Sequence, residues 1–124
     1  MFTTVLEEHE VTTEVRFPVP EKSHYEKFVQ LASWLALVGV LVAKYADALR
    51  VAVTGSSESG FFRWTAAKTV LSVKFLADAL DDLALNGDGM IADVYGSGAY
   101  RAHLVKVMTG RAVNATAYSN ANYN

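Results

Sequence analysis

Alternating apolar and polar positions dominate the first part of the chain. Residues 11–17 alternate Val, Thr, Val and Phe with more polar side chains, the period-2 pattern of a strand with one wet face, so we expect a strand there. Pro18 and Pro20 have no backbone donor and should end it. Residues 24–30 are aromatic and β-branched, which predicts a short strand, with a single helical turn as the alternative.

The next pattern predicts a hairpin. Residues 35–42 are almost wholly apolar and rich in Leu and Val, typical of a central strand buried on both faces. Residues 49–54 alternate again, and the stretch 44–47 between the two runs predicts a tight turn, although it lacks the usual Asn-Gly or Asp-Gly pair. Residues 55–60 are rich in Gly and Ser and predict a loop.

The second half of the chain has helical periodicity. Thr65 is placed to cap a short helix over residues 66–72. A second helix is expected over residues 76–85, with an apolar stripe on one side and Gly87 at its C-terminal end.

A third helix is expected over residues 98–115, with Ser97 as its cap and apolar residues at a 3.6-residue period. Strands followed by helices predict an α+β fold, a small antiparallel sheet of three or four strands with about three helices packed on one face. One domain is assigned to residues 1–116, and the polar, Asn-rich residues 117–124 are expected to form a disordered tail.

Composition and charge exclude several classes of protein. The chain has 124 residues, 52% hydrophobic and 19% charged, an ordinary globular composition. Its net charge is −2 and no basic stripe appears, so nucleic acid is not an expected partner. The absence of cysteine excludes disulfides, zinc–thiolate sites and iron–sulfur ligation within the chain. The longest apolar run, residues 31–43, is shorter than the roughly 20 residues of a membrane span, and no signal-peptide pattern is present, so we expect a cytoplasmic protein.

No self-contained active site is evident from residue spacing. The three histidines lie far apart and none shares metal-ligand spacing with another, so ordinary polar histidines are expected. The acidic pairs at 7–8 and 81–82 are neighbours in sequence, which point in different directions, and are interpreted as solvated surface. The Gly-Ser-Gly at 96–98 could bind an anion at a helix start, but helix capping is the preferred interpretation.

One segment is less ordinary. Lys27, Phe28 and Trp34 place a cation and two aromatic rings close together beside an apolar strand. A flat heteroaromatic ligand could stack there, with a cation near its anionic edge. The alternative, favoured by these residues alone, is a core aromatic cluster with Lys27 extending to water.

Six short motifs in order resemble a known family over roughly residues 2–113. The chain is similar to the C-terminal domain of the FAD-binding (medium) subunit of molybdenum hydroxylases of the carbon monoxide dehydrogenase and xanthine dehydrogenase type. The matching pieces are Phe2-Thr3-Thr4-Val5-Leu6 with Thr13-Glu14-Val15-Arg16-Phe17-Pro18, Tyr25-Glu26-Lys27-Phe28, Ala36-Leu37-Val38-Gly39-Val40, Arg50-Val51-Ala52-Val53-Thr54-Gly55, Arg63-Trp64-Thr65-Ala66-Ala67, and Asp93 with Ser97, Tyr100-Arg101, His103-Leu104, Val107-Met108 and Arg111-Ala112-Val113.

The resemblance implies a role. In such complexes a molybdenum subunit hydroxylates a substrate, an iron–sulfur subunit relays electrons, and FAD in the medium subunit passes them to an acceptor. The family's C-terminal domain covers part of the isoalloxazine ring, while most FAD contacts come from N-terminal subdomains that this sequence lacks. The resemblance therefore implies that the ring is contacted by Lys27, Gln30, Ala32, Ser33 and Trp34.

Departures from the family leave a second interpretation open. Residues 34–35 are Trp-Leu where relatives often have Gly-Tyr, loop 55–60 is Ser-rich where they often have Gly-Pro, and Lys68 stands where they often place Glu. The chain is thus interpreted either as part of an FAD-dependent oxidoreductase, inactive alone, or as a stand-alone interaction module that kept the fold. The implied partners are the FAD-binding part and the molybdenum and iron–sulfur subunits. Self-association through apolar surface is also expected.

Overall fold

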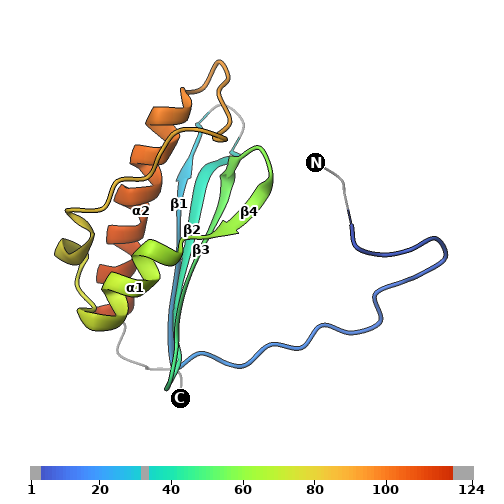
Figure 1. The fold of residues 1–124 in the computed structure, drawn as a ribbon, viewed down its shortest axis with the longest axis horizontal. Coiled ribbons are helices and arrows are strands. Elements are labelled where there is room, and N and C mark those ends of the chain that lie inside the picture. The colour runs from blue at the N-terminus through green and yellow to red at the C-terminus, as the bar shows by residue number, and fades with distance from the viewer. Residues whose placement is uncertain (1–3, 32–33, 119–124) are drawn as a thin grey trace.

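The computed structural model describes residues 4–31 and 34–118. Four antiparallel strands form one sheet in chain order, namely β1 (Lys22–Val29), β2 (Ala36–Lys44), β3 (Leu49–Ser57) and β4 (Gly60–Arg63). Two α-helices, α1 (Thr65–Val73) and α2 (Gly98–Tyr118), and the 3₁₀ turn η1 (Ala77–Leu80) lie on one side of the sheet (Figure 1). The expected α+β fold with helices on one face is confirmed, with two α-helices in place of about three.

The core lies between the sheet and α2. Val38, Val40 and Val42 of β2 are fully buried, because alternate residues of this central strand point toward the helices. Across the sheet they pair with Phe28 of β1 and with Val51 and Val53 of β3. The face of the sheet that packs against the helices therefore excludes water.

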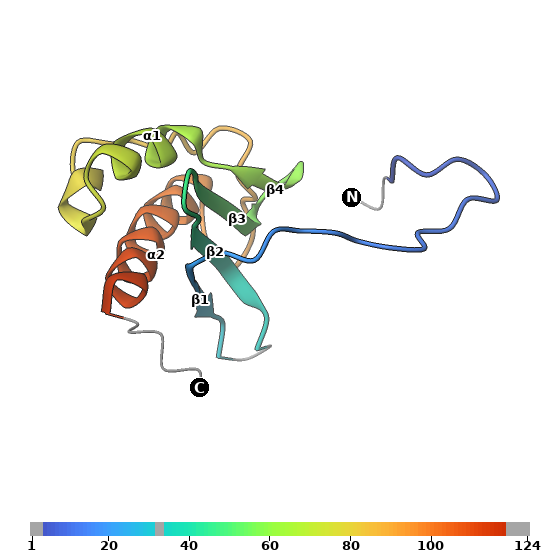
Figure 2. The same cartoon turned by 90° about the horizontal axis from the view of Figure 1, so that it is seen from below.

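The opposite side of the sheet, called here the open face, has no helix over it (Figure 2). Its side chains alternate with those of the core, and Leu41 is 38% exposed there although it lies in the central strand. β2 was expected to be buried on both faces. Its central position is confirmed. Burial on both faces is not, because on the open face only neighbouring side chains of the sheet shield it from water.

The strand expected over residues 24–30 is present as β1, and the hairpin is present as β2 and β3, closed by a hydrogen bond from the Tyr45 nitrogen to the Ala48 oxygen at 2.8 Å. The loop expected over residues 55–60 is wrong in part. β3 continues to Ser57, and β4 begins at Gly60 after a two-residue turn. Serine and glycine in this stretch are compatible with a strand end because a neighbouring strand supplies the hydrogen bonds.

The strand expected over residues 11–17 is absent. Residues 4–21, called here the arm, contain neither helix nor strand. Followed back from β1, the arm first runs outward on the side of the open face and then curves back near its N-terminal end (Figures 1 and 2). Val11, Val15 and Phe17 are 74–78% exposed. The alternation is real, but a strand needs a neighbour for its backbone hydrogen bonds, and no strand of the described chain pairs with residues 11–17.

The short helix expected over residues 66–72 is present as α1, but Thr65 does not cap it. Trp64 occupies the N-cap position without any side-chain hydrogen bond, and its side chain is buried instead. Burial of a large aromatic ring at this position outweighs the gain from a capping hydroxyl. Lys68 consequently lies one position further into the helix than the sequence suggested.

The second expected helix, over residues 76–85, is wrong, since only η1 forms there and Leu76 is extended. Gly87, the expected helix end, instead passes close to α2, where an added Cβ would lie 2.8 Å from the Ala99 nitrogen. The third helix is confirmed, with the Tyr100 nitrogen donating to Ser97 Oγ at 3.2 Å. α2 takes in the first two residues of the expected tail, and residues 119–124 lie outside the described part of the chain.

Candidate functional site

The residues proposed from the sequence to face a flavin lie around the connection between β1 and β2. Lys27 is exposed on β1, in register with Gly39 on the open face. Gln30 is partly buried at the end of β1, and Trp34 is exposed in the turn. Ala32 and Ser33 lie outside the described residues. The structure therefore places Gln30 and Trp34 in one turn and Lys27 on the adjoining strand.

This turn is strongly apolar at its surface. Leu31, Trp34 and Leu35, called here the apolar tip, are 86%, 78% and 72% exposed. The turn is closed by two backbone hydrogen bonds, from the Gln30 nitrogen to the Leu35 oxygen at 3.0 Å and from the Trp34 nitrogen to the Gln30 oxygen at 2.9 Å. Neighbouring exposed apolar side chains of this size mark interaction surfaces more often than free surface.

Trp34 has a left-handed backbone conformation, with φ at 58°. A bulky residue seldom adopts it, because its Cβ approaches the following carbonyl, at a cost of roughly 1–2 kcal/mol. Backbone strain of this kind concentrates at functional sites. Glycine, frequent at this position in the resembled family, would be free of the strain.

A buried arginine fixes the base of the turn. Arg101 of α2 is 3% exposed, and its Nη1 donates to the main-chain oxygens of Leu37 at 2.9 Å and Gly55 at 3.0 Å. Its Nη2 donates to Asp93 Oδ2 at 2.7 Å. The register of β1 and β2 shifts beside Val29, next to Leu37, so one bulged carbonyl is available to the guanidinium. One side chain thus joins β2, β3 and the loop before α2.

Gly55 makes this arrangement fit. Its φ is +78°, and a Cβ built on it would lie 2.8 Å from the Ala36 oxygen. Only glycine combines that conformation with so close an approach of two strands. Its carbonyl is thereby turned toward Arg101.

The carboxylate of Asp93, the third partner of Arg101, is held mainly by main-chain hydrogen bonds. The Tyr95 nitrogen donates to Asp93 Oδ1 at 2.9 Å, and this bond lowers the pKa of Asp93. Partial burial acts in the opposite direction, and the guanidinium of Arg101 lowers the pKa further. Asp93 is therefore kept ionised as the counter-charge of a buried cation.

A pocket of about 210 Å³ lies under the turn, lined by side chains that include Gln30, Leu35, Tyr95 and Arg101. Sites for drug-sized ligands are usually about 300–1,000 Å³. This pocket is therefore smaller than a usual site for a three-ring heterocycle. The described residues that line it include no nucleophile paired with a base.

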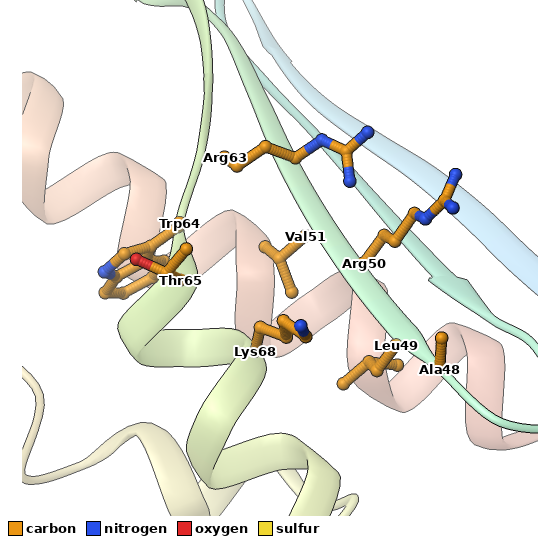
Figure 3. A pocket seen from close by; sticks show the side chains of 8 residues that line it. All are labelled: Ala48, Leu49, Arg50, Val51, Arg63, Trp64, Thr65 and Lys68. Atoms are coloured by element: carbon orange, nitrogen blue, oxygen red, sulfur yellow. The ribbon is translucent and has the colours of Figure 1, made fainter.

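A second pocket, of about 250 Å³, lies at the other end of β3, beside the start of α1 (Figure 3). Arg50 and Arg63 are on the open face by their register, and Figure 3 shows both guanidiniums extending away from Trp64 and Lys68. Arg50 stacks on the Tyr45 ring with its Cζ 4.8 Å from the centroid. Arg63 makes no ion pair with any residue in the described part of the chain. The three cations therefore do not converge on one ligand position.

Sequence reasoning assigned no site role to Arg101. A signal was present, since Arg101 continues the helical stripe of Leu104, Val105 and Met108, all buried. A charged residue on an apolar stripe must find partners inside the protein. Its two main-chain partners lie 46 and 64 residues away, which no spacing rule reveals.

Across residues 4–31 and 34–118, no group of three histidine or acidic residues could hold a metal ion. None of the helices in those ranges combines the length and apolar character needed to cross a bilayer. Comparisons with models of protein families, with curated proteins and with solved structures find no match to this chain.

Proposed function

We propose that this chain is the C-terminal module of the FAD-containing electron-transfer subunit of a molybdenum hydroxylase, where it covers one side of the flavin ring. The observation that carries the proposal is the apolar tip, an exposed and strained turn that Arg101 holds in place from below. The proposal also rests on the sequence resemblance. The compartment that goes with it is the cytoplasm.

The residues present are better suited to contacting one side of the flavin ring than to binding the whole of FAD. FAD supplies the capacity to accept electrons and pass them on, but its phosphates and adenine need a glycine-rich binding part that the sequence lacks. Within the chain, the indole of Trp34 offers a flat apolar surface, and the exposed ammonium of Lys27 offers positive charge on the adjoining strand. Positive charge near the ring would favour its reduced, anionic form. The apolar tip would also exclude water from that side.

A binding experiment tests the division of labour. FAD is added to the chain alone, and flavin fluorescence and calorimetric heat are recorded. We expect no binding at micromolar concentrations, because these 124 residues include no glycine-rich stretch of the kind that holds the phosphates. Micromolar affinity for the lone chain would contradict the proposed role.

A purification from the native source tests the assembly itself. The tagged chain should bring down flavin absorbance together with molybdenum, and Trp34→Ala should reduce the flavin recovered. Arg111→Ala, an exposed change on α2, is the matched control and should leave recovery unchanged. Wild-type protein recovered without flavin and molybdenum would overturn the proposal.

That result would leave the second candidate, a stand-alone interaction module. The specific observation in its favour is Trp34 itself, because a large side chain at a left-handed position is suited to protein contacts as well as to a ring. In that case the apolar tip would still bind a protein, and Trp34→Ala would still weaken the complex, with no cofactor present.

A further inference from the structure

The arm carries a group of exposed apolar side chains that the flavin proposal leaves unexplained. In an extended segment, residues 11, 13, 15 and 17 face one way, with Val11, Val15 and Phe17 among them, while residues 10, 12, 14 and 16 face the other way. The arm therefore has an apolar side and a charged side. It has the pattern of a strand but no neighbour.

A free strand edge is available in the same fold. β4 ends the sheet and pairs with β3 alone among the described strands, so its outer edge has unused backbone donors and acceptors. On the helix side of this edge, Phe62 lines a pocket of about 490 Å³ together with Leu85 and Met90. On the open face, the edge presents Phe61 and Arg63.

The two sides of the arm match the two sides of that edge. A strand added beside β4 would direct its apolar side chains toward Phe62 and the pocket, and its charged side toward Arg63. The charges are opposite. The charged side of residues 10–16 has Glu10, Glu14 and Arg16, a net charge of −1 with Glu14 Oε1 already 2.7 Å from Arg16 Nε, whereas the open face of β3 and β4 has Arg50 and Arg63 and no acidic strand residue.

The direction of the arm indicates which copy of the chain its strand would pair with. The arm leaves the sheet and runs outward (Figures 1 and 2). Pro18 and Pro20 keep the preceding residues extended. The turn of the arm, where the Glu10 nitrogen donates to the Glu7 oxygen at 3.2 Å, lies beyond the alternating stretch. Residues 11–20 therefore do not turn back toward their own sheet.

We propose that two copies of this chain exchange their arms, each arm adding a strand to the outer edge of the other copy's β4. A two-fold axis satisfies both arms and both edges at once, which closes the assembly as a dimer. The inference goes beyond the flavin role and does not depend on it.

Charge-swap variants of the full chain test the exchange by light scattering over a range of concentrations. Wild type should be a dimer that weakens with salt. Arg63→Glu and Glu14→Arg should each weaken dimerisation by on the order of tenfold, and the two together should restore it. Arg111→Glu carries the same charge change on the exposed side of α2 and should have no effect. A monomer at all concentrations, or a dimer insensitive to both reversals, overturns the proposal.

Disulfide trapping separates exchange from folding back, and the chain has no native cysteine to interfere. Thr12→Cys and Phe61→Cys lie on the matching side of arm and edge. Mixing the two single variants under oxidation should give a covalent heterodimer. A double variant that closes only within one chain, with no cross-linking between the single variants, refutes the exchange even if the arm does reach β4.

Discussion

Replacing Arg101 by methionine is the most direct test of how the base of the β1–β2 turn is held. The change removes the two hydrogen bonds to the main-chain oxygens of Leu37 and Gly55 and leaves an apolar side chain of similar length among them. Each buried carbonyl without a partner costs about 1–3 kcal/mol. Both groups belong to strands and cannot turn toward water without disturbing the sheet.

One term acts in the opposite direction. Nε of Arg101 is buried without a partner, so the native arginine already carries part of such a penalty. Removing the guanidinium removes that penalty. The two carbonyls cost about 2–6 kcal/mol and the relieved Nε returns about 1–3 kcal/mol, so the net loss is about 1–3 kcal/mol. This is a large share of the roughly 5–15 kcal/mol typical of a domain.

The assay is urea unfolding followed by circular dichroism, with Arg111→Met as the matched control. Arg111 lies on the same helix but is exposed, so its replacement should change the unfolding free energy by less than about 0.5 kcal/mol. Arg101→Lys should fall between the two, because an ammonium keeps the charge but lacks the planar fork. A loss of unfolding free energy below about 1 kcal/mol for Arg101→Met would show that the hydrogen bonds of Arg101 are not what holds the strands together.

Three further outcomes follow from the same region. Gly55→Ala should lower stability by about 2–4 kcal/mol in urea unfolding, because a left-handed φ is combined with a Cβ only 2.8 Å from a main-chain oxygen, whereas Gly60→Ala, with φ at +97° and open space, should lose only the backbone part of about 1–2 kcal/mol. Equal losses would refute the steric argument. Because the pKa of Asp93 is lowered in the folded state, its contribution to the unfolding free energy is present above its ordinary pKa and is lost as pH falls below it. Asp93→Asn should therefore flatten the acid side of a stability–pH profile and leave the region above pH 5 without a slope of this origin. Trp34→Gly should leave stability unchanged or raise it by up to about 1 kcal/mol in thermal melts, since relief of strain offsets the entropy of glycine; a clear loss would mean that the indole packs in the native state.

The sequence predicted the central strands and the long helix of this fold better than the arm and the edge strand β4. The valines of β2 and β3 and the stripe of α2 specify the core by period alone, and those elements are confirmed. The period of the apolar residues failed as a predictor where strand formation depends on a neighbouring strand. Residues 11–17 have a strand pattern without a strand beside them, and β4 has a neighbour but only four residues of pattern.

The second helix failed for a different reason. Residues 76–85 have an apolar stripe, yet Leu76 is extended and only η1 is helical. The segment is short, and helices of this length depend on packing rather than on propensity. Leu80 reaches the core from the 3₁₀ turn and is 2% exposed, so the apolar demand of the stripe is largely met without a full helix.

The candidate site shows the same limit more sharply. Residue chemistry alone directed attention to Lys27 and Trp34, and both prove to be exposed. The stripe of α2 marked Arg101 as buried, but two of its three acceptors are main-chain carbonyls, which every residue has and no motif distinguishes.

The combination of a fixed base and a strained tip has a functional consequence. A turn that exposes Leu31, Trp34 and Leu35 would rearrange to bury them if its strands were free to move, because the apolar area is large and the backbone of Trp34 is unfavourable. Arg101 ties β2 to β3 directly beneath and opposes that rearrangement. Apolar side chains held outward in this way lose little conformational entropy when a flat or apolar partner arrives, so binding is stronger than the same side chains on a loose loop would give. On this argument Arg101→Met should weaken binding at the apolar tip, flavin or protein, at temperatures where the variant is still folded.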